Sequence, residues 1–304
     1  MNYQDFKENI INAVVDFYGK DAEVRMGECV KNNGKRYDGI CIMHKDASED
    51  KEIIPVIYLD IIYEKYVSGE LKMEECIGMV IDLREREPIQ ENTRRFAENI
   101  TDWEKVRHSI YPMLLSTEEN RELLESLVTE PFLDLSIIYI VRGSIDNKGV
   151  VSTKITKSLL RCYEITVDEL RQQAISNLEM DGYAFEDMNN LLNIFNEKNE
   201  GEYTDSLGME EGRMYILSNT SKMYGSAGIL LKRLLKEQLG SQNCYILPSS
   251  VHETIFIPAS EKMDQEYLDS MVDEVNETLV GQEERLCNHS YYYDAQKEEI
   301  RITA

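Results

Sequence analysis

Long apolar runs are missing from this sequence. The longest ones, residues 53–59 and 135–141, are far shorter than the roughly 18 residues that a membrane-spanning helix needs. We interpret both runs as buried strands. The N-terminal residues also lack the basic patch and apolar core of a secretory signal. We therefore expect a cytoplasmic protein that does not contact a membrane.

Residues that bind metals or form disulfides are few and scattered. The 6 cysteines lie far apart without a Cys-x-x-Cys pair, and the 4 histidines show neither His-x-His nor His-Glu-x-x-His spacing. This pattern argues against a disulfide framework and against a zinc site, and it favours reduced, buried thiols. We predict no metal and no cofactor.

Positive charge is also scarce. The chain has 33 basic against 57 acidic residues, a formal net charge of -24, and no local basic patch. Such a surface repels phosphate backbones and anionic lipid, so the sequence predicts neither nucleic-acid nor membrane binding. The acidic residues are interspersed with lysines and arginines, which is typical of a solvated surface. The alternative is that the acidic surface is itself functional, by mimicking nucleic acid or by docking a basic partner.

The most informative pattern that is present is a near-repeat of Tyr-Ile-Leu at residues 215–217 and 245–247. Both runs are apolar and rich in aromatic and β-branched residues, and an amphipathic segment separates them. We predict a strand, a helix and a second strand, with the two strands parallel neighbours because the connection is long enough for a helix.

Periodicity and turn residues predict an α+β protein with mixed sheets and flanking helices in three small lobes. The predicted domains are an N-terminal α+β lobe at 1–95, a middle α+β lobe at 96–199, a linker at 200–212 and a C-terminal α/β lobe at 213–304. The C-terminal lobe has the order β-α-β-β-α-β-β. In the N-terminal lobe we expect a hairpin through Asn33-Gly34, a strand at 53–59 and helices at 60–67 and 71–86. In the middle lobe we expect a capping box at Thr166 and a helix around 185–195.

Two motifs carry a resemblance to known proteins. Tyr224-Gly225-Ser226-Ala227-Gly228 and the stretch Tyr245 to Glu253, together with the Tyr-rich C-terminal end, resemble an uncharacterised family of bacterial proteins, a domain of unknown function. The resemblance covers most of the chain. It implies a bacterial, intracellular protein and carries over no catalytic residue.

The turn after the second Tyr-Ile-Leu combines the residue types of a hydrolase. It contains Ser249, Ser250, His252 and Glu253, so a nucleophile, a base and an acid are present. However, side chains adjacent on one turn do not easily align as a triad, and the Gly-x-Ser-x-Gly elbow is missing. A serine hydrolase is therefore the weaker alternative, and we assign no catalytic residue.

The loop after the first Tyr-Ile-Leu is a second candidate, because an anion can bind where a strand leads into a helix. Its Gly-x-x-Gly matches neither the dinucleotide fingerprint nor a P-loop. Small residues that let the helix pack closely on the sheet are the other interpretation. The predicted ligand-binding residues of the 218–228 and 248–253 loops are Asn219, Lys222, Tyr224, Gly225, Ser249, Ser250, His252 and Glu253.

The function most consistent with these patterns is that of a non-catalytic protein-interaction or regulatory protein. The alternative is a small-molecule or nucleotide-binding protein that uses the two loops. The expected partner is accordingly a protein or a small anionic ligand, and the sequence leaves the oligomeric state open.

Overall fold

The chain forms two compact units. In a computed structural model, the residues described are 1–45, 54–85, 91–146, 149–188, 213–248, 250–260 and 262–303. The first unit contains Met1–Lys31 and Lys35–Asn99, and the second contains Asn32–Gly34 and Ile100–Ala304. Most of the predicted middle lobe and the whole predicted C-terminal lobe thus lie in one unit.

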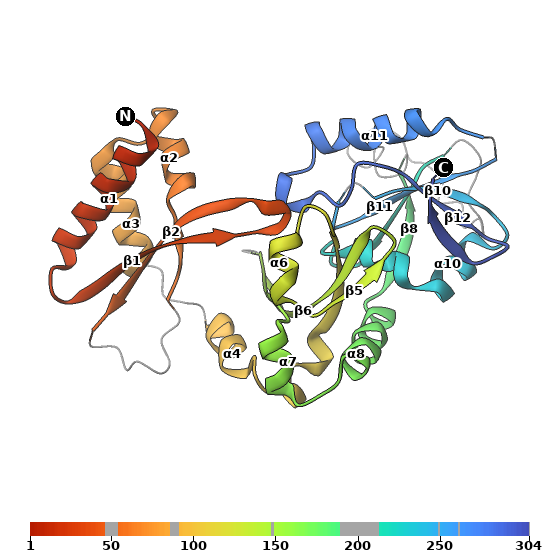
Figure 1. The fold of residues 1–304 in the computed structure, drawn as a ribbon, viewed down its shortest axis with the longest axis horizontal. Helices are drawn as coiled ribbons and strands as arrows, with labels where there is room; N and C mark the ends of the chain where they lie inside the picture. Colours follow the sequence, from red (N-terminus) through yellow and green to blue (C-terminus); the bar gives the residue numbers. More distant parts are fainter. Residues whose placement is uncertain are drawn as a thin grey trace, which may run out of the picture. The chain divides into compact units, whose positions relative to one another are not determined.

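The first unit is a three-stranded antiparallel sheet covered by helices (Figure 1). Its elements are α1 (Tyr3–Tyr18), β1 (Ala22–Val30), β2 (Arg36–His44), β3 (Ile57–Tyr58), α2 (Leu59–Val67), α3 (Met73–Glu85) and α4 (Glu91–Asn99). Helix α1 begins at an Asn2 cap, whose side chain accepts from the Asp5 amide, and it ends at Gly19 with φ 54°. The apolar stripe of α1, including Phe6 and Ile10, is buried together with Cys76 and Val80 of α3.

The second unit begins with a four-stranded antiparallel sheet. Its elements are α5 (Trp103–Val106), η2 (Arg107–Ser109), β4 (Ile110–Ser116), α6 (Arg121–Ser126), β5 (Thr129–Phe132), β6 (Leu135–Asp146), β7 (Gly149–Lys154), α7 (Lys157–Tyr163) and α8 (Val167–Met180). Strand β6 pairs with β4 along one edge and with both β5 and β7 along the other. The predicted capping box is confirmed, since Thr166 accepts from the Glu169 amide and the Glu169 side chain accepts in return.

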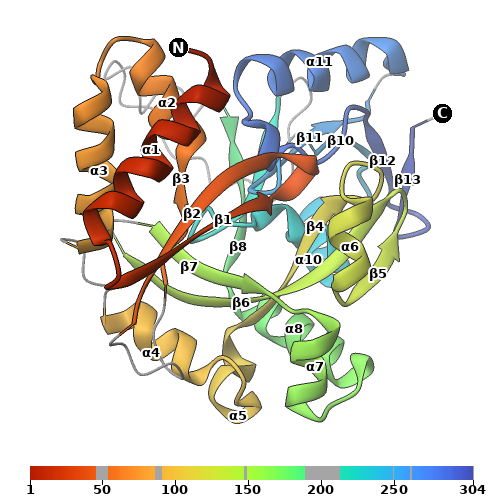
Figure 2. The same cartoon turned by 60° about the vertical axis from the view of Figure 1, so that its left-hand side comes forward.

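A six-stranded antiparallel sheet completes the second unit (Figure 2). Its elements are β8 (Tyr183–Asp187), β9 (Tyr215–Asn219), η3 (Gly225–Leu230), α10 (Lys232–Leu239), β10 (Cys244–Leu247), β11 (Thr254–Pro258), α11 (Gln265–Thr278), η4 (Gln282–Glu284), β12 (Tyr291–Asp294) and β13 (Glu299–Ile302). The strand order is β13-β12-β10-β11-β9-β8.

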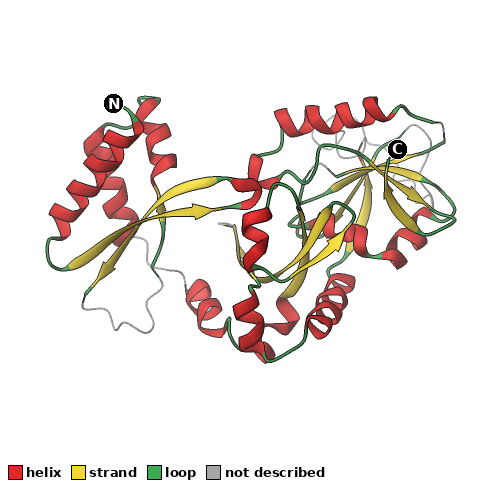
Figure 3. Cartoon of the chain, viewed as in Figure 1, coloured by secondary structure: helices red, strands yellow, loops and turns green. Residues whose placement is uncertain are grey.

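The two faces of the six-stranded sheet are buried against different elements. One core cluster combines Leu217, Ile246 and Phe256 of this sheet with Leu114 and Ile138 of the four-stranded sheet. A second cluster joins the opposite face to α11. The two sheets therefore pack on one another, and α11 covers the outer face (Figure 3).

A buried asparagine fixes the turn η1 (Asn32–Gly34) within the second unit. Asn33 has φ 55°, which asparagine tolerates better than most residues, and it is 6% exposed. Its Nδ2 donates to the carbonyl oxygens of Gln282 and Arg285, both at 2.7 Å. Its amide donates to Asn120 Oδ1, and Asn120 Nδ2 donates to Asn33 Oδ1, both at 2.7 Å. Gln282 Nε2 also donates to the Asn33 carbonyl at 3.1 Å, so five hydrogen bonds of one residue hold the turn.

The α+β class and the β-α-β-β-α-β-β order are confirmed. The prediction that the strands of the near-repeat are neighbours was wrong. Strands β9 and β10 run in the same direction, but β11 lies between them and pairs antiparallel with both. Strand β11 follows β10 directly in the chain and lies between β9 and β10. The near-repeat of Tyr-Ile-Leu does not indicate the position of this strand.

Three further predictions need correction. Residues 185–187 of the predicted helix around 185–195 belong to strand β8, Met188 is helical, and residues 189–195 lie outside the described residues. Most of the predicted strand 53–59 lies before β3, which contains only Ile57–Tyr58, and α2 already begins at Leu59. The expectation of buried thiols fails at Cys162, which is exposed; all six cysteines are free.

Among the described residues, no helix is both long enough and apolar enough to cross a membrane.

Candidate functional site

Asn219 organises the loop that leads from β9 into η3. Its side chain is buried, and its Oδ1 accepts from the Met223 amide at 3.1 Å. Its Nδ2 donates to the Met223 carbonyl at 2.9 Å and to Asp181 Oδ2 at 2.7 Å. Two residues inside the loop, Lys222 and Tyr224, have left-handed backbones with φ 54° and 57°. The Asn219 side chain therefore forms hydrogen bonds with the amide and the carbonyl of Met223, in place of backbone partners that such a tight loop does not provide.

The glycines of the Tyr-Gly-Ser-Ala-Gly motif allow close packing. A Cβ added at Gly225 would lie 2.5 Å from both the His252 carbonyl oxygen and Ser218 Oγ. A Cβ at Gly228 would lie 2.5 Å from the Tyr183 ring. Both distances are shorter than van der Waals contact allows. The two glycines thus allow η3 to pack closely against the 248–253 turn and against β8. This agrees with the structural interpretation of the small residues in the motif.

Both ring nitrogens of His252 contact protein groups. Its Nδ1 accepts from the Tyr224 amide at 3.2 Å, so the ring proton lies on Nε2, which is 3.4 Å from Glu284 Oε1. The ring stacks on Tyr224, with centroids 5.5 Å apart. The His252 carbonyl accepts from Ser218 Oγ at 2.9 Å. His252 therefore connects the 218–228 loop to the 248–253 loop through these contacts.

The serines of this region also make local contacts. Ser250 is 7% exposed, and its Oγ accepts from the His252 amide at 3.0 Å. Ser226 Oγ donates to the Val251 carbonyl at 2.8 Å. Glu253 is half-buried, and Ser249 lies outside the described residues.

The structure brings the two predicted loops together through some of the predicted residues. Tyr224 and Gly225 lie against His252 through the contacts above, whereas the Asn219 side chain contacts Asp181 and Met223. Lys222 is instead half-exposed and its Nζ lies 2.7 Å from Glu186 Oε2. Ligand binding by these loops stays a prediction, and a ligand would compete there with existing hydrogen bonds.

A buried ion pair beside the first loop was not found from the sequence. Arg142 and Asp181 form a two-pronged pair, and each side chain is 10% exposed. The Arg142 guanidinium lies 3.7 Å from the centroid of the Tyr111 ring. Burial lowers the pKa of Arg142, but the hydrogen bond and charge of Asp181 outweigh it, so the pKa is raised. No spacing motif links residues 39 positions apart, and only the fold brings them together.

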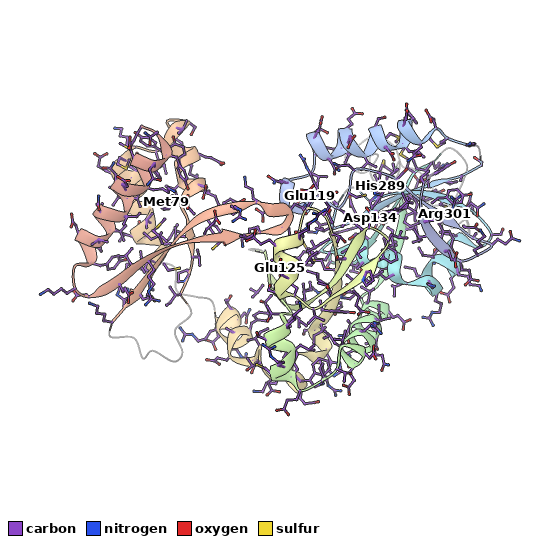
Figure 4. The ribbon with its side chains drawn as sticks, viewed as in Figure 1. Met79, Glu119, Glu125, Asp134, His289 and Arg301 are labelled. Carbon is purple, nitrogen blue, oxygen red and sulfur yellow. The ribbon has the colours of Figure 1, made fainter. Side chains whose placement is uncertain are left out.

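A group of residue types familiar from catalysis lies at the end of β12 (Figure 4). His289 Nε2 is 2.8 Å from Asp134 Oδ2, and the Tyr291 hydroxyl donates to Asp134 Oδ1 at 2.6 Å. Cys287 Sγ donates to the His289 carbonyl at 3.0 Å, so it faces the backbone of His289. Burial raises the pKa of the Cys287 thiol to about 12, which keeps it protonated near neutral pH. These residues thus join the turn after β5 to β12 without forming a reactive thiolate.

The second unit also contains a pocket of about 470 Å³. Apolar side chains from β5, β6, η3, α10 and β13 form most of its wall: Phe132, Ile137, Ile229, Leu230, Leu235 and Ile300. Tyr293 also lines it, and its buried hydroxyl has no hydrogen-bond partner among the described residues. The pocket was not predictable from the sequence because most of its wall consists of ordinary core-type residues that come from many separate elements.

The charged groups at the pocket largely satisfy one another. Arg171 pairs with Glu130, and its Nη1 lies 2.8 Å from Asp168 Oδ1. Glu130 also accepts from the Tyr139 hydroxyl. Burial, followed by the hydrogen bond to Glu130, raises the pKa of Tyr139. Lys232, Glu298 and Glu299 also line the pocket, so an apolar depression is bordered by charges of both signs.

The family relationship of the chain follows from its match to a family model. The model described as Family of unknown function (DUF5688) matches residues 3–295. The chain belongs to this family. Membership confirms the resemblance to an uncharacterised family and extends over both units. No curated protein and no solved structure matches the chain.

Proposed function

We propose that this chain is a non-catalytic binding protein that holds an apolar side chain of a protein partner in the pocket of its second unit. The observation that carries the proposal is the pocket itself. Its volume of about 470 Å³ falls in the range of ligand pockets, which is roughly 300 to 1,000 Å³, and its wall is mainly apolar. A large aliphatic or aromatic side chain matches such a site, since buried anchors of this kind dominate protein interfaces.

The charges around the pocket favour a protein partner over a small anion. Glu130 and Asp168 neutralise Arg171, and the remaining cation among the described residues there, Lys232, shares the border with Glu298 and Glu299, so the border has no net positive charge for a ligand anion. The net charge of -24 would instead attract a partner with basic residues around its apolar anchor. Electrostatic attraction of this kind mainly raises the association rate, and the apolar anchor supplies the affinity.

The contacts of His252 support a non-catalytic function over the serine hydrolase alternative. A general base needs a ring nitrogen within hydrogen-bond reach of the serine hydroxyl. The two nitrogens of His252 lie against the Tyr224 amide and Glu284, while Ser250 Oγ accepts from the His252 backbone amide. Ser250 and His252 therefore support loop structure.

A peptide-display selection tests the proposal. Random peptides are selected on the wild-type chain, and the affinity of enriched peptides is measured by calorimetry. Leu230→Trp and Ile175→Trp fill the pocket from η3 and α8. Each should weaken binding about tenfold or more, because an occupied pocket cannot accept the anchor. Tyr267→Trp is the matched control, since Tyr267 is 56% exposed on α11 and does not line this pocket.

Two results would contradict the proposal. Peptides that bind the filled variants as well as wild type would place the interaction elsewhere. Binding of octanoate or an anilinonaphthalene dye in the pocket, without any enriched peptide, would indicate a small-molecule site. Thermal stabilisation by nucleotides or phosphate that Lys222→Ala abolishes would instead support the loop site.

A further inference from the structure

Strand β13 ends the six-stranded sheet. Among the described strands it pairs only with β12, through Tyr291↔Ile302, Tyr292↔Arg301, Tyr293↔Ile300 and Asp294↔Glu299. Its other edge presents backbone N–H and C=O groups that a further strand can pair with. Glu299 and Arg301 are exposed and Ile302 is 42% exposed. The edge is therefore short and accessible, and it carries one acidic residue, Glu299, and one basic residue, Arg301.

We propose that this edge is a homodimer interface, in which β13 of a second copy of the chain pairs antiparallel with β13 about a two-fold axis at Ile300. Such an interface is isologous, so each contact occurs twice. The sheet then continues from one copy into the other (Figure 2 shows β12 and β13 at this end of the sheet). Glu299 and Ile300 also line the pocket, so the second copy would border it, but the inference does not depend on what the pocket binds.

The charges of β13 select one register. With Ile300 opposite Ile300 of the second copy, Glu299 lies directly opposite Arg301 of that copy, and Arg301 lies opposite its Glu299. Opposite charges in directly facing positions stabilise an antiparallel pair, and like charges destabilise it. Centring the axis on Glu299 or on Arg301 would place identical charges opposite each other. A shift of the pairing by one residue would set Ile300 against a charged residue.

The same register also covers apolar surface. Ile300 and Ile302 lie on one face of the strand because side chains alternate, and Ile300 packs against the main core cluster. In the dimer, Ile302 of each copy becomes a diagonal neighbour of Ile300 of the other. The four isoleucines then form one strip across the interface. This strip shields Ile302, an exposed large apolar residue on an edge strand.

Charge complementarity favours a second copy over an unrelated strand. Charged residues on an edge strand commonly prevent pairing, but they do so when like charges meet. In β13 the order Glu299, Ile300, Arg301 is complementary to itself when the strand is reversed. The net charge of -24 opposes association of two copies, and at physiological salt screening limits this repulsion to a range of about 8 Å.

Sedimentation velocity of the full chain, at concentrations up to roughly 100 µM because small interfaces are weak, tests this interface. Glu299→Arg and Arg301→Glu each convert two attractive pairs into two repulsive ones. Each variant should weaken dimerisation about tenfold or more. The double variant Glu299→Arg/Arg301→Glu restores opposite charges at both pairs and should dimerise again. Glu277→Arg, at an exposed position of α11, matches the charge change of Glu299→Arg and should leave dimerisation unchanged.

Mixing the two single variants gives the sharpest test. Each alone should be monomeric, but together they form complementary pairs at both positions and should yield a heterodimer. This outcome also shows that both variants are folded. A monomeric wild type overturns the proposal, and so does a dimer that the single variants leave intact. Failure of the mixed variants to associate overturns it as well.

Discussion

Gly225→Ala is expected to destabilise the second unit substantially. The added Cβ would lie 2.5 Å from the His252 carbonyl oxygen and from Ser218 Oγ, and 2.9 Å from the Asn219 amide nitrogen. Ordinary contact begins at 3.4 Å, so the closest atoms must separate by 0.9 Å. Two of the three atoms belong to backbone, which cannot rotate away. The loops must therefore move apart.

The magnitude of this effect follows from two contributions. Overpacking a well-packed site costs about 1–3 kcal/mol. Separation of the loops also weakens the hydrogen bonds that His252 accepts from Ser218 Oγ and the Tyr224 amide, each worth about 0.5–1.5 kcal/mol. We expect a loss of about 3 kcal/mol in the free energy of unfolding. For a unit of this size, that corresponds to a decrease in Tm of about 6–12 °C.

The single tryptophan makes the assay specific. Trp103 lies in the second unit, so its fluorescence during urea unfolding reports on that unit. Gly281→Ala is the matched control in the same unit, because its Cβ would meet only Glu284 Oε2, at 3.9 Å, and its φ is -60°. The control should change stability by less than about 0.5 kcal/mol. If Gly225→Ala unfolds at the same urea concentration as the control, the packing explanation of the glycine motif is wrong.

Three further perturbations test other contacts of the second unit. Asn33→Ala removes the side-chain hydrogen bonds to the Gln282 and Arg285 carbonyls and to Asn120, and should lower the unfolding free energy by about 2–3 kcal/mol in the Trp103 assay. Asp181→Asn leaves the Arg142 guanidinium buried without its counter-charge and should cost about 3–5 kcal/mol, whereas unchanged stability would contradict the burial of this pair. Iodoacetamide at pH 8 should modify Cys162 much faster than Cys287, as measured by peptide mass spectrometry. At that pH, burial keeps the Cys287 thiol protonated because its pKa is raised to about 12.

Local patterns were sufficient for most elements. The helix at Thr166 was predictable because a capping box is encoded within four residues, and the hairpin of β1 and β2 was predictable from Asn33-Gly34 between alternating strands. Strand β8 was mistaken for the start of a helix. Its pairing partner, β9, is 28 residues away at its nearest pair, Asp187 and Tyr215, and a window of sequence does not contain that contact.

The sequence predicted that the 218–228 and 248–253 loops lie near each other, but it did not predict which of their atoms are in contact. It placed both loops beyond strands of equal direction, which is correct, but it could not anticipate β11 between those strands. Whether His252 faces a serine or a backbone amide depends on angstrom-scale positions. These positions are decided by η3, which approaches closely only because residues 225 and 228 have no side chain.

By itself, the sequence determined the α+β class, the order of the C-terminal elements and membership in a family of unknown function. These properties depend on local periodicity, turn residues and motif spacing. Tertiary structure alone decided the strand order, the Arg142–Asp181 pair, the pocket and the position of β13 at the end of the sheet that the described strands form. Each of these joins residues that are distant in the chain. Their contacts result from the packing of two sheets on one core, and no short segment of sequence encodes that arrangement.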